Sequence, residues 1–139
     1  MKLEKLFKVE NKELYTMDGQ KYPLQGKALS VKWSDVEGSP EEYNEEFLAK
    51  LRDNLKSLEE KKEFVFIEPL FDKDGSKEGF TAAMKHTARR IKDCTSVIGF
   101  ALPEEILEEK DFYIEELSAK HAHYCFFCKK DLGNDIVLY

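Results

Sequence analysis

The sequence predicts one α/β domain with a mainly parallel sheet, preceded by an N-terminal β-hairpin. Val97–Leu102 is an unbroken apolar run, which is typical of a strand that is covered on both faces of a parallel sheet. Between residues 26 and 139, such runs alternate with amphipathic helical patterns over short connections. Residues 1–25 instead carry closely spaced turn signals, which favour a hairpin. A length of 139 residues fits a single domain with its own core.

The expected elements follow in chain order, beginning with the hairpin. Leu6–Val9 and Glu13–Thr16 are its predicted strands, and Asp18-Gly19 is a turn dipeptide after them. Gly26–Trp33 is apolar at most alternate positions, so it is expected to form the first strand of the main sheet.

A capping signal predicts where the first helix begins. Ser39-Pro40-Glu41-Glu42 offers an N-cap serine, a proline at the first helical position and a glutamate at the third. Residues at helical spacing then form one apolar face, namely Tyr43, Phe47, Leu48, Leu51, Leu55 and Leu58. Phe64–Ile67 is the next expected strand, and Pro69 is expected to end it because proline cannot continue a central ladder.

The second half of the chain continues the alternation. After a turn at residues 72–76, a second helix is expected from the apolar stripe of Phe80, Met84, Thr87, Ala88 and Ile91. Val97–Leu102 is the third strand, and a further helix is expected within residues 104–120. Tyr124–Cys128 and Ile136–Leu138 are the last two expected strands. Because so few strands leave a sheet edge exposed, a homodimer is a reasonable expectation.

Composition limits the possible partners. The net charge of −6 argues against a nucleic-acid or anionic-membrane surface, and no apolar run is long enough to span a bilayer. Three cysteines, an odd number, disfavour a disulfide framework and favour a reducing compartment. The N-terminus lacks the apolar core of a signal peptide, so a cytoplasmic protein without a cofactor is expected, although a processed or cloned portion of a longer chain is the alternative.

Carboxylates at the C-terminal strand ends are the first candidate site, because parallel sheets hold ligands there. Glu104 and Glu105 follow the third strand, and they could form an acid/base cluster with Glu68 and Asp35. The alternative is that the two glutamates only begin a helix, where acidic residues favour the helix dipole. Trp33 offers either a sugar-stacking platform or a lid on the core.

His121–Cys128 is the second conspicuous string, because a Cys-x-x-Cys pair can bind zinc or exchange disulfides. On a strand, however, Cys125 and Cys128 would point to opposite faces, and no second Cys-x-x-Cys completes a zinc site. A thiol or zinc protein is therefore an alternative hypothesis, and no metal is assigned.

Three segments resemble glycoside hydrolase family 5. Residues 18–26 are similar to its opening D-G-x-x-x-x-L-x-G hairpin, and residues 64–69 to its third strand. Residues 90–105, with Val-Ile-Gly-Phe-Ala-Leu-Pro-Glu-Glu, resemble the strand that ends in the family's Asn-Glu-Pro motif. The resemblance implies a partial (half) TIM barrel, because the chain covers about the first half of a family barrel.

The resemblance also implies site residues. Glu105 falls on the family's acid/base glutamate and Glu104 on its asparagine, while Lys32 is nearest to the position of a family arginine. The family's nucleophile lies on a seventh strand that this chain lacks, so a partner for Glu105 would come from Glu68, Asp72 or Asp35, or from a second subunit.

The leading hypothesis is therefore a catalytically degenerate glycosidase-like domain that binds carbohydrate or another small ligand at the strand ends. Trp33, Glu104, Lys32 and Asp72 are the expected ligand-binding residues. The enzyme alternative is a minimal glycoside hydrolase with Glu105 as the acid and Glu68 or Asp35 as the base.

Overall fold

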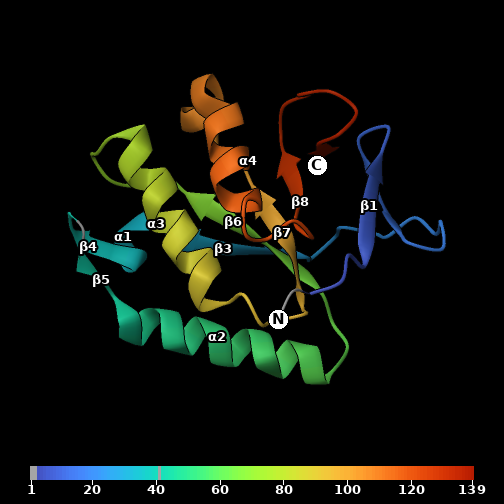
Figure 1. Cartoon of the computed structure of the whole chain (residues 1–139), viewed down its shortest axis with the longest axis horizontal. Coiled ribbons are helices and arrows are strands. Elements are labelled where there is room, and N and C mark those ends of the chain that lie inside the picture. Colours follow the sequence, from blue (N-terminus) through green and yellow to red (C-terminus); the bar gives the residue numbers. More distant parts are fainter. Residues whose placement is uncertain (1–2, 41) are drawn as a thin grey trace.

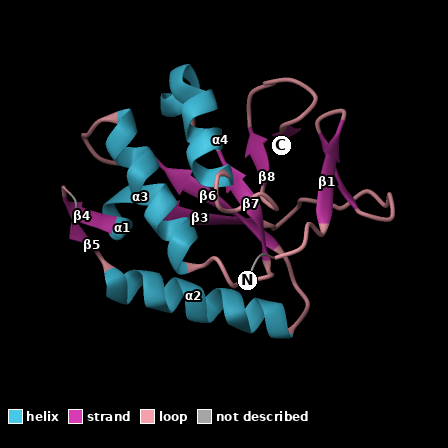
Figure 2. Ribbon diagram, viewed as in Figure 1, coloured by secondary structure: helices cyan, strands magenta, loops and turns pink. Residues whose placement is uncertain are grey.

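The computed structural model describes residues 3–40 and 42–139, which form a mixed α/β fold (Figures 1 and 2). Its elements are, in order, β1 (Phe7–Glu10), β2 (Glu13–Thr16), β3 (Ala28–Lys32), α1 (Trp33–Val36), β4 (Glu37–Ser39), β5 (Glu42–Tyr43), α2 (Glu45–Glu60), β6 (Val65–Leu70), α3 (Lys77–Arg90), β7 (Val97–Ala101), the 3-10 helix η1 (Glu104–Glu109), α4 (Lys110–Ser118), β8 (Cys125–Cys128) and β9 (Val137–Leu138).

The main sheet has five parallel strands in the order β3-β6-β7-β8-β9, so neighbours in the sheet are also successive along the sheet-forming part of the chain. β1 and β2 form a separate antiparallel hairpin, and β4 and β5 form a short antiparallel ribbon. The predictions of a mainly parallel α/β sheet and of an N-terminal hairpin are thereby confirmed. None of the helices in the described ranges has the length and apolarity needed to cross a lipid bilayer.

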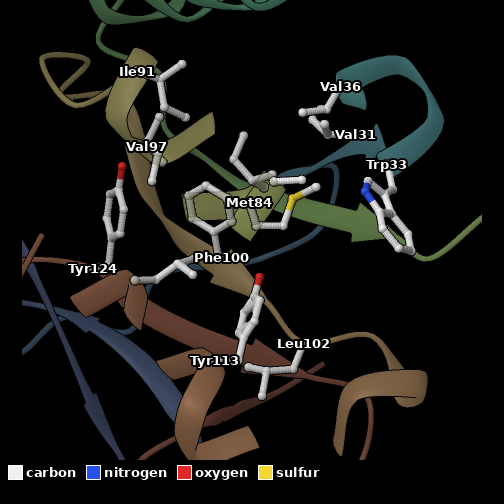
Figure 3. Close-up of a cluster of buried hydrophobic side chains, with 14 of the residues drawn as sticks. Val31, Trp33, Val36, Met84, Ile91, Val97, Phe100, Leu102, Tyr113 and Tyr124 are labelled. Atoms are coloured by element: carbon white, nitrogen blue, oxygen red, sulfur yellow. The ribbon is translucent and has the colours of Figure 1, made fainter. Parts of the chain in front are cut away.

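The two faces of the sheet are covered by different partners. On one face, Val31, Ile67 and Phe100 pack with buried side chains of α2, α3 and α4, as the close-up in Figure 3 shows for part of this cluster. On the other face, Phe66 and Phe127 belong to a second cluster with the hairpin residues Phe7 and Leu14. The hairpin contributes to the core in this way; in Figure 1 it lies on the opposite side of β8 from α3.

A bulge in β7 explains why its side chains do not simply alternate. Val65 pairs with Val97 and Ile67 pairs with Phe100, so β7 has one residue more than β6 over this stretch. Gly99 lies in the bulge, where an added Cβ would come within 1.7 Å of the carbonyl oxygen of Cys125. Only glycine permits this close approach of β7 to β8.

The predicted start of the first helix is wrong. Ser39 belongs to β4, Glu42 belongs to β5, and residue 41 of the predicted capping box lies outside the described residues. The helix begins at Glu45, and the side chain of Asn44 caps it by accepting a hydrogen bond of 3.0 Å from the Phe47 amide. The short ribbon takes the place of the helical turn that the serine-proline signal favours.

Pro69 does not end its strand, contrary to the sequence prediction, because β6 continues to Leu70. The Phe66 amide donates to the carbonyl of Lys27, just before β3, and the Val65 amide donates to that of Ser96, just before β7. Because amides along a strand point alternately to its two neighbours, the backbone nitrogen of Pro69, which has no hydrogen to donate, faces β7. The ladder between β6 and β7 has already stopped at Ile67, so no hydrogen bond is lost there.

Candidate functional site

A cavity of about 350 Å³ lies at the C-terminal ends of the parallel strands. Side chains from the ends of β6, β7, β8 and β9 line it, which is the expected place for a ligand on such a sheet. The polar and aromatic members of its lining are Glu68, Glu104, Lys129, Lys130 and Tyr139.

Glu68 is the carboxylate with the most contacts in this cavity. It lies on β6 with a side chain that is only 18% exposed. Its Oε2 accepts a hydrogen bond of 2.6 Å from the Tyr139 hydroxyl, and its Oε1 accepts one of 3.2 Å from Ser30 on β3. Lys129 Nζ lies 3.7 Å from Oε2. The carboxylate is held in place from three strands or strand ends, and it remains accessible from the cavity.

Tyr139 adds an oriented phenol to the same cavity. Its ring packs edge-on against Phe66 at a centroid distance of 5.0 Å, and the Lys129 ammonium lies 5.6 Å from its centroid. Burial raises the pKa of Tyr139 above that of a free phenol, and the hydrogen bond to Glu68 raises it further. Tyr139 therefore stays protonated at neutral pH and acts as a hydrogen-bond donor.

Glu104 lies at the rim of the cavity and is exposed. It follows Pro103 at the start of η1, and its Oε1 accepts a bond of 2.7 Å from Lys130 Nζ. This bond lowers the pKa of Glu104, so the carboxylate is ionised at neutral pH. Glu104 thus forms an ion pair across the mouth and is unsuited to donating a proton.

The predicted carboxylate cluster is only partly assembled. Glu68 and Glu104 share the cavity, whereas Glu105 and Asp35 have exposed side chains and, within the described part of the chain, do not line it. Glu105 lies in the first turn of η1, as the helix-start alternative proposes, and Asp35 lies in α1. Consecutive residues at a helix start diverge in direction, so Glu105 leaves the cavity that Glu104 borders.

Trp33 is a core residue, so its prediction as a ligand platform is corrected. It is only 2% exposed and packs against Phe71 and Phe80. Its Nε1 donates a hydrogen bond of 2.8 Å to the buried Glu37, and the ammonium of Lys73 lies 5.0 Å from its ring centroid. No ring face is free for a sugar, because protein atoms cover this side chain.

Lys32 at the end of β3 is close enough to Asp72, in the loop after β6, to lower its pKa, but neither is a lining residue of the cavity in the described part of the chain. Asp72 accepts 2.9 Å and 2.5 Å bonds from the Ser34 amide and hydroxyl. Desolvation raises the pKa of Asp72, but the bonds from Ser34 outweigh it and the net shift is downward. Asp72 is best explained as an anchor for the loop after β6.

The two cysteines of the Cys-x-x-Cys string lie on opposite faces of β8, as the alternation of a strand predicts. Cys125 packs in the cluster that includes the hairpin residues Phe7 and Leu14, whereas Cys128 packs in the cluster with the helices α2, α3 and α4. Burial raises the pKa of the Cys125 thiol to about 11, so it is not a thiolate at neutral pH. Within residues 3–40 and 42–139, no three His, Cys, Asp or Glu side chains are grouped for a metal ion. This geometry disfavours both the zinc and the thiol hypotheses.

Sequence reasoning found Glu68 and Glu104 but missed Lys129, Lys130 and Tyr139. A signal was available, because all three directly follow the predicted strands Tyr124–Cys128 and Ile136–Leu138. The rule that ligands are held at C-terminal strand ends therefore applied to them as well.

Comparisons with known proteins give no significant match to a protein-family model, to a curated protein or to a solved structure.

Proposed function

We propose that this chain is a glycosidase-like domain that binds a small polyhydroxylated ligand, of the carbohydrate class, at the C-terminal strand ends without hydrolysing it. The observation that carries the proposal is Glu68, a carboxylate held by Ser30 and Tyr139 and open to a cavity of about 350 Å³. A cavity of this volume falls within the range of small-molecule sites.

The chemistry of the cavity suits sugar hydroxyl groups. The ionised carboxylates accept hydrogen bonds from hydroxyls, while Lys129 and Lys130 donate them. Tyr139 presents a partly exposed aromatic ring, which can pack against the apolar face of a sugar ring. Both charge signs are present and mostly paired, which favours a neutral ligand over an ionic one.

The arrangement of the fold is compatible with a half barrel. Successive parallel strands lie in chain order, and the helices α2, α3 and α4 pack on one face. A (β/α)8 barrel places its helices outside and its ligand at the C-terminal strand ends in the same way. This similarity supports the proposal that the sheet is the counterpart of the first part of a family 5 barrel.

The cavity is unsuited to glycoside hydrolysis, because a glycosidase needs one protonated carboxyl group as the acid and one ionised carboxylate. Glu104 is ionised by its pair with Lys130, and Glu105 and Asp35 are exposed residues that are not among the lining residues of the cavity. Within the described lining, Glu68 is the remaining carboxylate, so it lacks a second carboxyl group that could serve as the acid.

A binding experiment with three proteins tests the proposal. Neutral monosaccharides and short oligosaccharides are titrated into the wild-type chain by calorimetry, with a thermal-shift screen in parallel. We expect binding that Glu68→Gln weakens about tenfold, because a charged acceptor is replaced by a neutral one. Glu105→Gln is the matched control, since it removes a neighbouring carboxylate outside the cavity and should bind as the wild type does.

Two results would contradict the proposal. If no sugar in the panel raises the melting temperature or gives a heat of binding, the ligand class is wrong. If the wild type hydrolyses an activated aryl glycoside and Glu68→Gln does not, the domain is an enzyme, and the non-catalytic proposal fails. Turnover that is lost only in Glu105→Gln would instead support the minimal-hydrolase alternative.

A further inference from the structure

A second cavity, of about 300 Å³, lies near the N-terminal ends of the strands, away from the cavity proposed to bind carbohydrate. The C-terminal half of α3, the end of α4 and the turn before β8 form its walls. Its lining is strongly basic and includes Arg89, Lys92, Lys120, His121 and His123. This concentration of cations occurs in a chain whose net charge is −6.

Of the four lysine and arginine side chains among the described lining residues, Arg89, Lys92 and Lys120 lack carboxylate partners. In the described ranges, Arg89, Lys92 and Lys120 make no ion pair and no side-chain hydrogen bond. The neighbouring Arg90 behaves differently, because its Nε donates a 2.8 Å bond to Glu45 on α2. At the C-terminal end of α3, Arg90 is therefore neutralised by Glu45, whereas Arg89, which lines the cavity, is not neutralised.

The single acidic side chain among the lining residues does not cancel this charge. Glu116 on α4 accepts a bond of 3.1 Å from Lys85 on α3, and these two lining residues neutralise each other. The helix dipole explains the basic residues in the last turn of α3 and favours Lys120 just beyond the end of α4. It does not explain the two histidines, which belong to the turn.

His121 is the second, independent feature of the cavity. It is only 7% exposed, it lines the cavity, and its ring has no hydrogen-bond partner among residues 3–40 and 42–139. The ring of Tyr124 stacks on it at a centroid distance of 5.2 Å, which fixes its orientation. Nε2 of His123, another lining residue, is buried and also unpartnered. Buried polar groups without partners usually mark a missing ligand or water.

We propose that this cavity binds a phosphate group, as inorganic phosphate or as the phosphate monoester of a small molecule. A phosphate monoester carries a charge of about −1.5 to −2 and three strong acceptor oxygens at neutral pH. Three unpaired cations neutralise that charge, and Arg89 offers the planar donor fork that recognises phosphate. His121 adds an imidazole N–H donor at the wall. A monovalent carboxylate would leave most of the positive charge unneutralised.

The test compares two charge-matched triple variants with the wild-type chain. The cavity variant is Arg89→Gln, Lys92→Gln, Lys120→Gln, and the control is Lys50→Gln, Lys61→Gln, Lys110→Gln, which removes the same charge from exposed or surface positions. Inorganic phosphate and glycerol 3-phosphate are titrated against sodium chloride of equal ionic strength. Melting temperature and the NMR signals of the imidazole C–H groups are followed.

We expect both phosphates to raise the melting temperature of the wild type and of the control variant, and to shift the signals of His121 and His123. The cavity variant should bind about tenfold more weakly or worse, because charge-assisted bonds are lost. Tighter binding of glycerol 3-phosphate would identify a monoester as the ligand, and equal binding would identify free phosphate. If the response to phosphate equals that to chloride, or if both triple variants lose it equally, the proposal is overturned.

Discussion

The charged side chains at the two ends of the parallel strands differ, because they are paired at one end and largely unpaired at the other. At the C-terminal ends, Glu68 and Glu104 each meet a donor, and Lys129 and Lys130 lie within 4 Å of them. Near the N-terminal ends, Arg89, Lys92 and Lys120 line a cavity and have no ion-pair partner in the described part of the chain. A paired set of charges is complete without a ligand and suits a neutral one, whereas an unpaired set requires a counter-charge from outside.

This difference shows that net charge is a poor guide to local partners. An excess of acidic residues argues against anionic ligands for the surface as a whole. It does not prevent helix ends and a turn from bringing several cations to one cavity. The following predictions separate the two ends experimentally, from the largest expected effect to the smallest.

Gly99→Ala should disrupt both ends at once, because it acts on the sheet that joins them. The new Cβ would lie 1.7 Å from the Cys125 carbonyl oxygen, so β7 and β8 would have to separate. We expect a loss of about 3 kcal/mol or more in the free energy of unfolding, measured with urea. Gly38→Ala is the control, since a Cβ there meets nothing within 4 Å. An equal effect of both substitutions would contradict the tight contact.

Glu37→Leu should destabilise the fold through contacts beyond the C-terminal ends of β3 and β6, where Trp33 and Lys73 lie. The substitution leaves the buried Trp33 N–H without its acceptor and Lys73 without a carboxylate 3.7 Å away. We expect a loss of about 2 kcal/mol in the free energy of unfolding. Glu37→Gln keeps an acceptor oxygen for Trp33 and should cost clearly less. If the two variants are equally destabilised, the hydrogen bond from Trp33 is not the cause.

Protonation of His121 and His123, which line the basic cavity, should lower the free energy of unfolding. Burial, together with nearby cations, lowers the pKa of His121 and His123 below 6.5. The unfolded chain then binds these protons more readily than the folded chain below pH 6.5, so stability should fall as pH decreases from 7 through the lowered pKa values. The measurement is urea unfolding across this interval. The double variant His121→Gln, His123→Gln should flatten the slope, and an unchanged slope would contradict the assignment.

Glu104→Gln should have the smallest effect on stability. Its ion pair with Lys130 is exposed, with side chains 73% and 58% accessible, so solvent and salt screen it strongly. We expect a melting temperature equal to that of the wild type within experimental error. Binding of a ligand in the adjacent cavity should be more sensitive than stability, because the substitution changes the rim. A large drop in melting temperature would show that the ion pair is structural.

Part of the candidate site was predictable from local sequence. The apolar run Val97–Leu102 predicts β7, and the rule for parallel sheets then places Glu104 near a ligand. Glu68 was found for the same reason, although its strand extends past Pro69. The same reasoning did not separate Glu104 from Glu105, because the direction of a side chain at a helix start depends on the exact first residue of that helix.

The first helix shows a different limit of sequence reasoning. Serine and asparagine are both favourable N-cap residues, so local propensity does not choose between the predicted cap Ser39 and the observed cap Asn44. The choice follows from the amide of Asn44, which donates a 2.7 Å bond to the Val36 carbonyl and closes the β4–β5 ribbon. Trp33 is similar, because its burial depends on Gly75 and Phe80 from distant segments.

The sequence by itself determined the class of fold, the hairpin, and the order of the main-sheet strands and the three longer helices, because hydrophobic periodicity and turn residues act over short distances. Only the tertiary structure decided which polar side chains come together. Glu68 and Tyr139 are 71 positions apart and form a 2.6 Å bond. Arg89 and Lys120 come from different helix ends and face one cavity. Such encounters depend on the register and packing of whole elements, which the pattern of any single segment does not contain.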